Sequence, residues 1–186
     1  MSRFEIIDGL PSYGPAALPF PEDGRGAFRE GFVIRFHPAA CASWVGNFQR
    51  GISGGDWIVD RPDGQQVVVI AGGGGYVVDP ETRRQTHEFG GGINFVQQVP
   101  PLNIVVIGNG TQLGVFSADG LSWTERISWD GMQNIAVSGT ILHGEAWSPI
   151  SNMWRPFELD LRTGKTVGSV YGEQMGGAVQ ISPPRL

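Results

Sequence analysis

The sequence predicts an all-β fold made of about four small antiparallel sheets, each with four strands. Three observations lead to this prediction. Short apolar runs recur along the chain, for example VVVIAG at 67–72, IVVIGN at 104–109 and TILHGE at 140–145. Tight-turn residues separate the runs, because 29 glycines and 13 prolines are spread through the chain. The runs are rich in β-branched and aromatic residues and lack a helical apolar stripe, which favours strands over helices.

The runs repeat at a nearly constant spacing. Ala71, Gly108 and Gly144 mark equivalent places in three successive runs, and these small residues lie 37 and 36 residues apart. Around each of them we expect four short strands, and four strands at a period of about 40 residues are typical of a propeller blade. The repeat units defined by this spacing are about 55–92, 93–131 and 132–172.

Within each unit the four runs follow one another through recognisable turns. RPDG at 61–64 and PPL at 100–102 separate the first run from the second, and both are made of turn residues. The third run leads into a turn that contains an aspartate or its equivalent, and glycines close each unit. The expected runs are 56–60, 67–72, 76–84 and 82–89, then 93–99, 104–109, 113–122 and 121–129, then 134–139, 140–145, 157–166 and 165–171.

The two ends of the chain supply material for a fourth unit. We expect a single domain over residues 1–186, with a Pro/Gly-rich extension at 1–30. The segment GGAVQISPPRL at 176–186 resembles GGINFVQQVPPLN, which opens the second unit. Pairing of 176–186 with 31–54 would build a composite fourth unit, close the propeller-like array and protect its edges. A β-sandwich or an open meander is the alternative architecture.

Two hairpins carry a resemblance to a known class of repeats. YVVDPETRR at 76–84 and FELDLRTGKT at 157–166 resemble the outer hairpins of β-propeller blades of the quinoprotein and YVTN type. In those blades a strand ends in aspartate, turns through a Pro/Leu-x-Thr-Gly segment and returns. The resemblance covers roughly residues 55–172. It implies the fold and carries over no catalytic residue.

Composition and charge narrow the classes of partner. The net charge is −5 and the isoelectric point is about 5.1. An acidic chain lacks the basic face that nucleic acids or anionic membranes require, and it suits a basic protein partner. The chain has one cysteine, Cys41, and its N-terminal sequence lacks a signal-peptide pattern, so we expect a cytoplasmic protein without an intrachain disulfide. The oligomeric state stays open.

Motifs that suggest catalysis do not match their full patterns. TGKT at 163–166 resembles the end of a phosphate-binding loop, but Leu159 stands where that motif needs glycine. The glycines at 72–75 lack the third glycine and the helix of a dinucleotide fingerprint. No Gly-x-Ser-x-Gly elbow occurs. We therefore predict no catalytic residue, no metal site and no cofactor, and we favour a protein that is not an enzyme.

One set of polar residues follows from the repeat. Asn109 directly follows Gly108, and Glu145 directly follows Gly144. His37 takes the corresponding place one period before the first unit. In a closed ring these positions would share one side near the axis, where ligands commonly bind. His37, Asn109 and Glu145 are therefore a candidate ligand site; the alternative is that they are ordinary turn-flanking polar residues.

The third unit is longer than its siblings. The additional residues lie at 146–156 and include Trp147, Met153, Trp154 and Arg155. Aromatic residues, methionine and arginine are enriched where proteins anchor their partners, so we predict a partner-binding loop here. The alternative is that both tryptophans pack back onto their own sheet.

These features favour one class of function over another. The leading hypothesis is a non-enzymatic protein-interaction module, of the regulatory or immunity type. The alternative is a small-ligand-binding or hydrolytic propeller that uses the polar residues at 37, 109 and 145.

Overall fold

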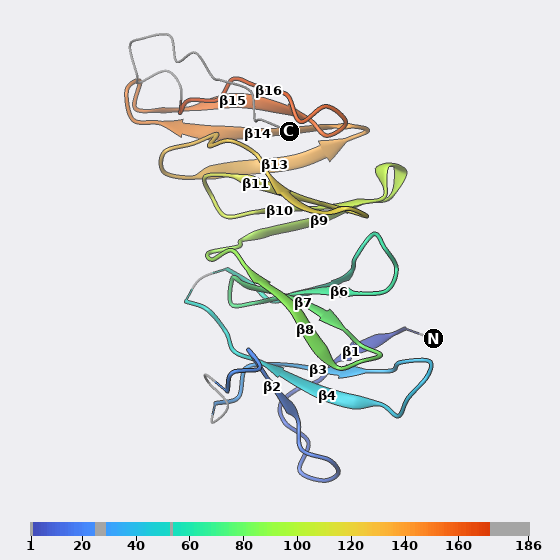
Figure 1. Ribbon diagram of the computed structural model, residues 1–186. Helices are drawn as coiled ribbons and strands as arrows, with labels where there is room; N and C mark the ends of the chain where they lie inside the picture. The colour runs from blue at the N-terminus through green and yellow to red at the C-terminus, as the bar shows by residue number, and fades with distance from the viewer. Residues whose placement is uncertain (1, 25–28, 53, 172–186) are drawn as a thin grey trace. The chain divides into compact units, whose positions relative to one another are not determined.

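The computed structural model describes residues 2–24, 29–52 and 54–171, and it confirms the all-β prediction. The strands form four sheets of four strands each, a pattern consistent with a propeller-like arrangement (Figure 1). None of the helices in these ranges is long and apolar enough to span a membrane. The chain divides into two compact units, of which the first is Met1–Asn109 with Gly114–Trp123 and the second is Gly110–Leu113 with Thr124–Leu186.

Sheet A draws all four strands from residues 4–48, including the Pro/Gly-rich segment at the start of the chain. The strand order is β1 (Phe4–Ile6), β3 (Phe32–Phe36), β4 (Trp44–Phe48) and β2 (Leu18–Phe20). β3 pairs antiparallel with both β1 and β4, whereas β2 pairs parallel with β4. The expected composite unit needed residues 176–186, which lie outside the described residues. The first 30 residues thus contribute two edge strands of sheet A.

Sheet B has apolar residues on both faces. It consists of β5 (Trp57–Asp60), β6 (Val67–Ala71), β7 (Gly74–Asp79) and β8 (Arg84–Phe89), joined in chain order. Every residue of β6 is buried. Alternate side chains along a strand point to opposite faces, so the continuous apolar run VVVIA serves two separate cores.

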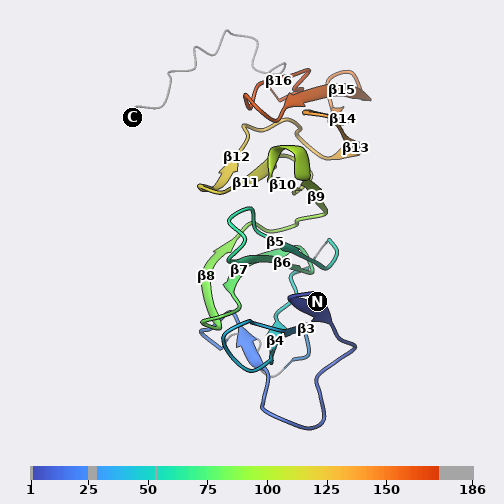
Figure 2. The same cartoon turned by 90° about the vertical axis from the view of Figure 1, so that its right-hand side faces the viewer.

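The two faces of sheet B pack against two different sheets of the first unit (Figure 2). Val67 and Val69 join a core with Phe36 and Phe48 of sheet A. Val68 and Ile70 join a second core, which is completed by the sheet formed from residues 95–123, sheet C. The side chains from sheet C in that second core are Val105, Ile107 and Phe116, with Val96, Leu121 and Trp123 packed around them.

Glycines allow backbones to meet where the chain passes between these sheets. The Gly51 N–H donates to the Ala71 carbonyl at 2.9 Å, and the Ile93 N–H donates to the Gly73 carbonyl at 3.0 Å. Gly54 has a φ of +80°, and a Cβ placed on it would lie 1.9 Å from the Ile93 carbonyl oxygen. Gly72 and Gly73 therefore form the turn between β6 and β7, and the glycines at 90–92 link sheet B to the next strand.

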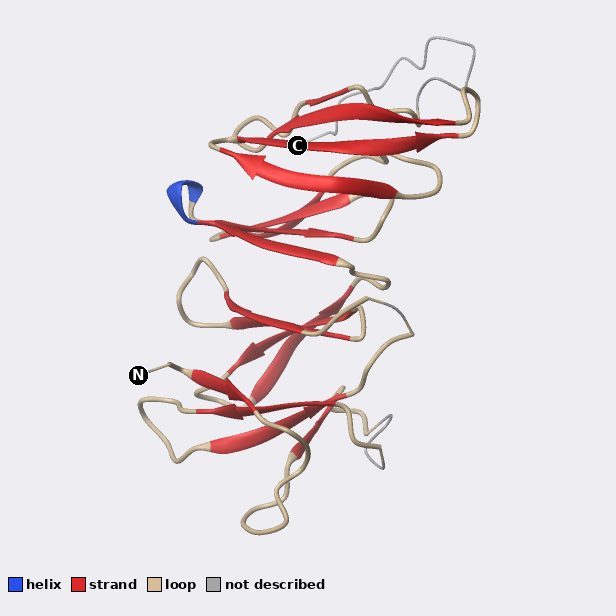
Figure 3. Ribbon diagram, turned by 180° about the vertical axis from the view of Figure 1, so that it is seen from behind, coloured by secondary structure: helices blue, strands red, loops and turns tan. Residues whose placement is uncertain are grey.

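Sheet C repeats the order of sheet B. Its strands are β9 (Phe95–Val99), β10 (Ile104–Gly108), β11 (Leu113–Ser117) and β12 (Gly120–Trp123). A short 3-10 helix, Pro100–Leu102, links β9 to β10 and is drawn in blue in Figure 3. The predicted run at 121–129 is a strand only as far as Trp123. Residues 124–129 are irregular.

Sheet D belongs to the second unit and is buried mainly on one face. Its strands are β13 (Met132–Ser138), β14 (Ile141–Ser148), β15 (Met153–Asp160) and β16 (Thr166–Val167). Burial alternates strictly along β14. The buried residues of β14 and β15 are Leu142, Gly144, Ala146, Ser148, Phe157 and Leu159.

Sheets B and D use the same hairpin turn, as the two similar sequences predict. Asp79 Oδ1 accepts from the backbone N–H groups of Glu81 and Thr82, and Asp160 Oδ1 accepts from those of Arg162 and Thr163. A residue with positive φ completes each turn, Arg83 at 63° and Gly164 at 71°. The TGKT segment thus completes a hairpin turn and enters β16 at Thr166, whereas a phosphate-binding loop leads into a helix.

Candidate functional site

The longest hairpin of the described chain contains the segment predicted as a partner-binding loop. β14 and β15 pair over eight positions, from Ile141 opposite Asp160 to Ser148 opposite Met153. The additional residues of this unit therefore lengthen two paired strands, and only residues 149–152 form the turn between them. Gly144 and Glu145 consequently lie inside β14, whereas Ala71 and Gly108 end β6 and β10.

The two tryptophans of the segment face each other across the strands. Trp147 is the register partner of Trp154, and their ring centroids lie 5.4 Å apart in an edge-to-face arrangement with an interplanar angle of 65°. Cross-strand aromatic pairs of this geometry stabilise antiparallel strands. Trp154 stays 36% exposed. The pair thus holds the end of the hairpin in shape while presenting aromatic surface.

The other two residues of the predicted loop lie on the opposite face of the hairpin. Met153 and Arg155 are opposite Ser148 and Ala146, so they alternate with Trp154. An Arg155 Nη1 to Met153 Sδ contact of 3.9 Å joins them. The structure therefore brings the four predicted residues together on one hairpin as two pairs, one on each face.

The tip of the hairpin adds exposed apolar surface. Ile150 is 60% exposed and Met153 is 48% exposed. The turn is fixed locally, because the Ser151 N–H donates to Ser148 Oγ at 3.4 Å and Asn152 adopts a φ of 51°. Asparagine tolerates this left-handed conformation better than most residues with a side chain. The apolar tip is held by a defined turn.

Polar groups continue the face that carries the tryptophans. Glu145 Oε2 accepts from Gln133 Nε2 at 2.9 Å and from Asn134 Nδ2 at 2.7 Å. Next along the strands, His143 Nδ1 lies 3.7 Å from Glu158 Oε1. Because these residues lie on the same face as Trp147 and Trp154, we call this surface the Trp face.

One edge of β15 is paired over only part of its length. In the described part of the chain, β16 pairs with β15 at Glu158 and Leu159 alone. Met153, Trp154 and Arg155 extend past the last of these pairs, and all three are exposed. An exposed edge of this kind offers backbone hydrogen-bonding groups to another extended chain.

The residues of the predicted polar site lie at the ends of strands or within one. His37 directly follows β3 of sheet A, where its Nδ1 lies 3.1 Å from Ser43 Oγ and its Nε2 lies 3.5 Å from Glu5 Oε2. Asn109 directly follows β10 of sheet C. Sheets A and C, which these two residues border, pack on opposite faces of sheet B. A ligand site that joins these residues with Glu145 stays a prediction.

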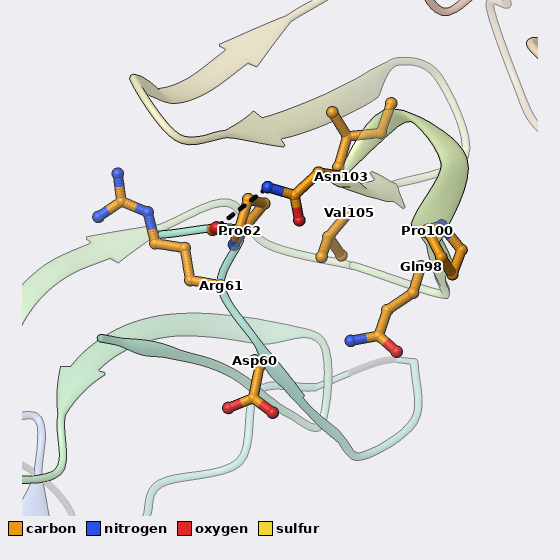
Figure 4. A pocket seen from close by; sticks show the side chains of 8 residues that line it. Asp60, Arg61, Pro62, Gln98, Pro100, Asn103 and Val105 are labelled. Carbon is orange, nitrogen blue, oxygen red and sulfur yellow. Dashed lines mark hydrogen bonds between the residues drawn. The ribbon is translucent and has the colours of Figure 1, made fainter. Parts of the chain in front are cut away.

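A small hollow in the first unit lies beside the loop after β5 (Figure 4). Its volume is about 260 Å³. Two of the polar side chains that line it bridge segments of the chain: Asn103 Nδ2 donates to the Pro62 carbonyl at 3.2 Å, and Asp60 Oδ1 lies 3.1 Å from Arg3 Nη1. Because both groups bridge segments of the chain, we assign this hollow a structural role.

The pKa of Asp160 is perturbed in the folded chain. The backbone N–H of Arg162 lowers the pKa of Asp160 below its ordinary value of 3.8, with further hydrogen bonds from Thr163 and the charge of Arg162 acting in the same direction. This carboxylate belongs to the β15–β16 turn. Across residues 2–24, 29–52 and 54–171, no group of three or more His, Cys, Asp or Glu side chains could hold a metal ion.

Comparison with known proteins adds no family assignment. No protein-family model matches the chain, and no curated protein matches it significantly.

Proposed function

We propose that this protein is a non-enzymatic protein-interaction module and that the β14–β15 hairpin is its binding element. The observation that carries the proposal is the Trp147–Trp154 pair, a half-exposed aromatic pair held near the tip of the longest hairpin. A few residues carry most of the binding energy at protein interfaces; tryptophan and arginine are enriched among them, and methionine is enriched at interfaces generally. The hairpin presents all three residue types from paired strands.

The hairpin's rigidity supports binding with little loss of conformational freedom. Eight register pairs and the Trp–Trp contact fix the two strands before any partner arrives. Side chains that are already ordered lose less entropy on binding than those of a mobile loop. A partner would therefore gain most of the hydrophobic contribution of the exposed Trp154 and Ile150 surface.

Charge indicates the kind of partner. Glu145, Glu158 and Asp160 share the Trp face, and the whole chain has a net charge of −5. A basic protein surface would be attracted to this face, because complementary charges accelerate association and suppress incorrect partners. A regulatory or immunity-type role, in which this chain covers a basic surface of another protein, fits these charges.

Site-specific photo-cross-linking in cells of the natural source tests the proposal. A photoreactive amino acid that replaces Ile150 should give a discrete cross-linked protein. The same photoreactive amino acid in place of Leu10, which is also exposed, should give none. Trp154→Ala in the Ile150 background should reduce that cross-link about tenfold or more, the effect of losing a tryptophan hot spot.

Two results would contradict this role. One is a cross-link pattern identical at Ile150 and Leu10. The other is a discrete product at Ile150 that persists unchanged in the Trp154→Ala variant. Circular dichroism of Trp154→Ala, unchanged from the parent chain, would show that any loss reflects the surface and not the fold.

A further inference from the structure

A second, larger hollow lies in the first unit between the outer strands of sheets B and C. Its volume is about 410 Å³, within the size range of small-molecule sites. Phe116 and Val77 are buried beneath it. The other residues that line it are Arg61, His87, Phe89, Asp119, Gly120, Leu121 and Trp123.

Aromatic rings form its walls because glycines leave room for them. Phe89 lies over its register partner Gly75, where an added Cβ would come within 2.4 Å of the ring. Trp123 lies over its register partner Gly114, where a Cβ would come within 3.1 Å of the indole. Phe89 also makes an edge-to-face contact with Phe116, with ring centroids 5.1 Å apart. The walls are therefore fixed by packing and not by a ligand.

Arg61 contributes a wall of the hollow and little free positive charge. Its Nη1 lies 3.1 Å from Asp63 Oδ2 and also donates to Gln66 Oε1. Its Nη2 donates to the Ala118 carbonyl at 3.3 Å. Since Asp63 compensates the guanidinium, an anionic ligand would gain little from it.

Asp119 is differently placed. Its backbone N–H donates to Ser117 Oγ, but within the described part of the chain its carboxylate has no hydrogen-bond or ion-pair partner. His87, across the hollow on β8, likewise makes none there. The free charge beside the aromatic walls is therefore negative, with an imidazole as an additional hydrogen-bonding group.

We propose that this hollow binds a small ligand that combines a planar apolar body with a protonated amine. The apolar body would lie between Phe89 and Trp123, and the ammonium group would pair with Asp119. A cation near an aromatic face gains a further electrostatic attraction, strongest for tryptophan. This inference goes beyond the proposed protein-binding role, which uses sheet D.

Phenethylamine is a suitable probe, with 3-phenylpropionate as the anionic analogue of similar size. In a ¹H–¹⁵N spectrum of the full chain, six tryptophan indole signals are expected, and Trp123→Phe identifies that of Trp123. Phenethylamine should shift the Trp123 signal with saturation in the millimolar range, typical of so small a ligand. The phenylpropionate should bind about fivefold more weakly or worse, as expected for one ion pair.

Two matched variants separate the carboxylate from general charge. Asp119→Asn should weaken phenethylamine binding about fivefold, because it removes the ion pair while keeping the side-chain shape. Asp8→Asn makes the same charge change at another exposed position and should leave binding unchanged.

The proposal would be overturned by any of three results. These are no saturable shift of Trp123 with the amine, equal affinities for the amine and the acid, or equal binding by the Asp119→Asn and Asp8→Asn variants. The Trp147 and Trp154 signals belong to the hairpin and report separately, so failure here leaves the protein-binding proposal to its own test.

Discussion

Sheets B and D have similar turns and the same strand order, but they bury their residues differently. In β6 of sheet B, five consecutive residues are buried, whereas in β14 of sheet D buried and half-buried residues alternate. Sheet B packs apolar side chains on both faces. Sheet D keeps charged groups and the tryptophan pair on one face. A similar repeat thus forms a structural layer buried on both faces in one place and a sheet with one partly solvated face in another.

The largest expected effect comes from cavities on both faces of sheet B. Ile70→Ala and Val69→Ala truncate neighbouring buried residues on opposite faces. The isoleucine change should lower the free energy of unfolding by about 2–5 kcal/mol, and the valine change by about 2 kcal/mol. Urea unfolding followed by tryptophan fluorescence measures both.

Truncating two neighbouring residues of β14 in sheet D should lower the free energy of unfolding by a large amount at the buried position and by a small amount at the half-buried one. Leu142→Ala removes a fully buried side chain and should cost about 2–5 kcal/mol. Ile141→Ala removes a half-buried one and should cost about 1 kcal/mol or less. Equal losses at Ile141 and Leu142 would refute the one-sided description of sheet D.

The next largest loss of stability is expected where a glycine allows two backbones of the first unit to approach closely. Gly54→Ala adds a Cβ 1.9 Å from the Ile93 carbonyl oxygen, at a φ of +80°. Gly64→Ala adds one at a φ of +69° with open space around it. The Gly64 change should cost about 1 kcal/mol from backbone strain alone, and the Gly54 change about 3 kcal/mol. Thermal unfolding of the two variants compares them directly.

The shared turn of sheets B and D predicts changes of opposite sign. Arg83→Gly should stabilise sheet B by up to about 1 kcal/mol, because glycine adopts the φ of 63° without strain. Gly164→Ala should destabilise sheet D by about the same amount. Urea unfolding of the two single variants checks the signs. The same sign for both would show that the turns are not equivalent.

The smallest expected effect is a pH dependence at Asp160. Its pKa is lowered in the folded state, so the ionised carboxylate favours folding above the ordinary value of 3.8 and this contribution is lost as pH falls through the folded pKa. The parent chain should therefore exceed Asp160→Asn in stability at neutral pH. The difference should disappear on acidification below 3.8. Urea midpoints across this pH range measure it, and a constant difference would contradict the assignment.

Much of the strand pattern follows from local sequence. The runs at 67–72 and 104–109 correspond to β6 and β10 almost residue for residue, because five consecutive apolar residues between turns have few alternatives. The paired aspartate turns at Asp79 and Asp160 also follow from residue type. These features depend on interactions within a few residues.

Other features depend on contacts that the sequence does not reveal. β2 contains Pro19 and pairs parallel with β4, which is distant from it in the chain. The segment at 146–156 reads as a loop because it makes the third unit longer than the other two, yet β14 and β15 pair through it and carry the cross-strand Trp147–Trp154 contact. The hollow at Asp119 depends on two glycine–aromatic pairs whose partners lie on adjacent strands. Which glycine lies opposite which ring becomes known only from the strand register in the structure.

The way each sheet draws on one continuous stretch of chain has a consequence for how the protein folds. Sheet A uses residues 4–48, sheet B 57–89, sheet C 95–123 and sheet D 132–167. In sheets B, C and D every pairing joins consecutive strands of the chain, and such local pairings favour rapid folding, whereas sheet A pairs β1 with β3 and β2 with β4. A ribosome would release each sheet complete before the next begins, so edges that could aggregate would be exposed only briefly.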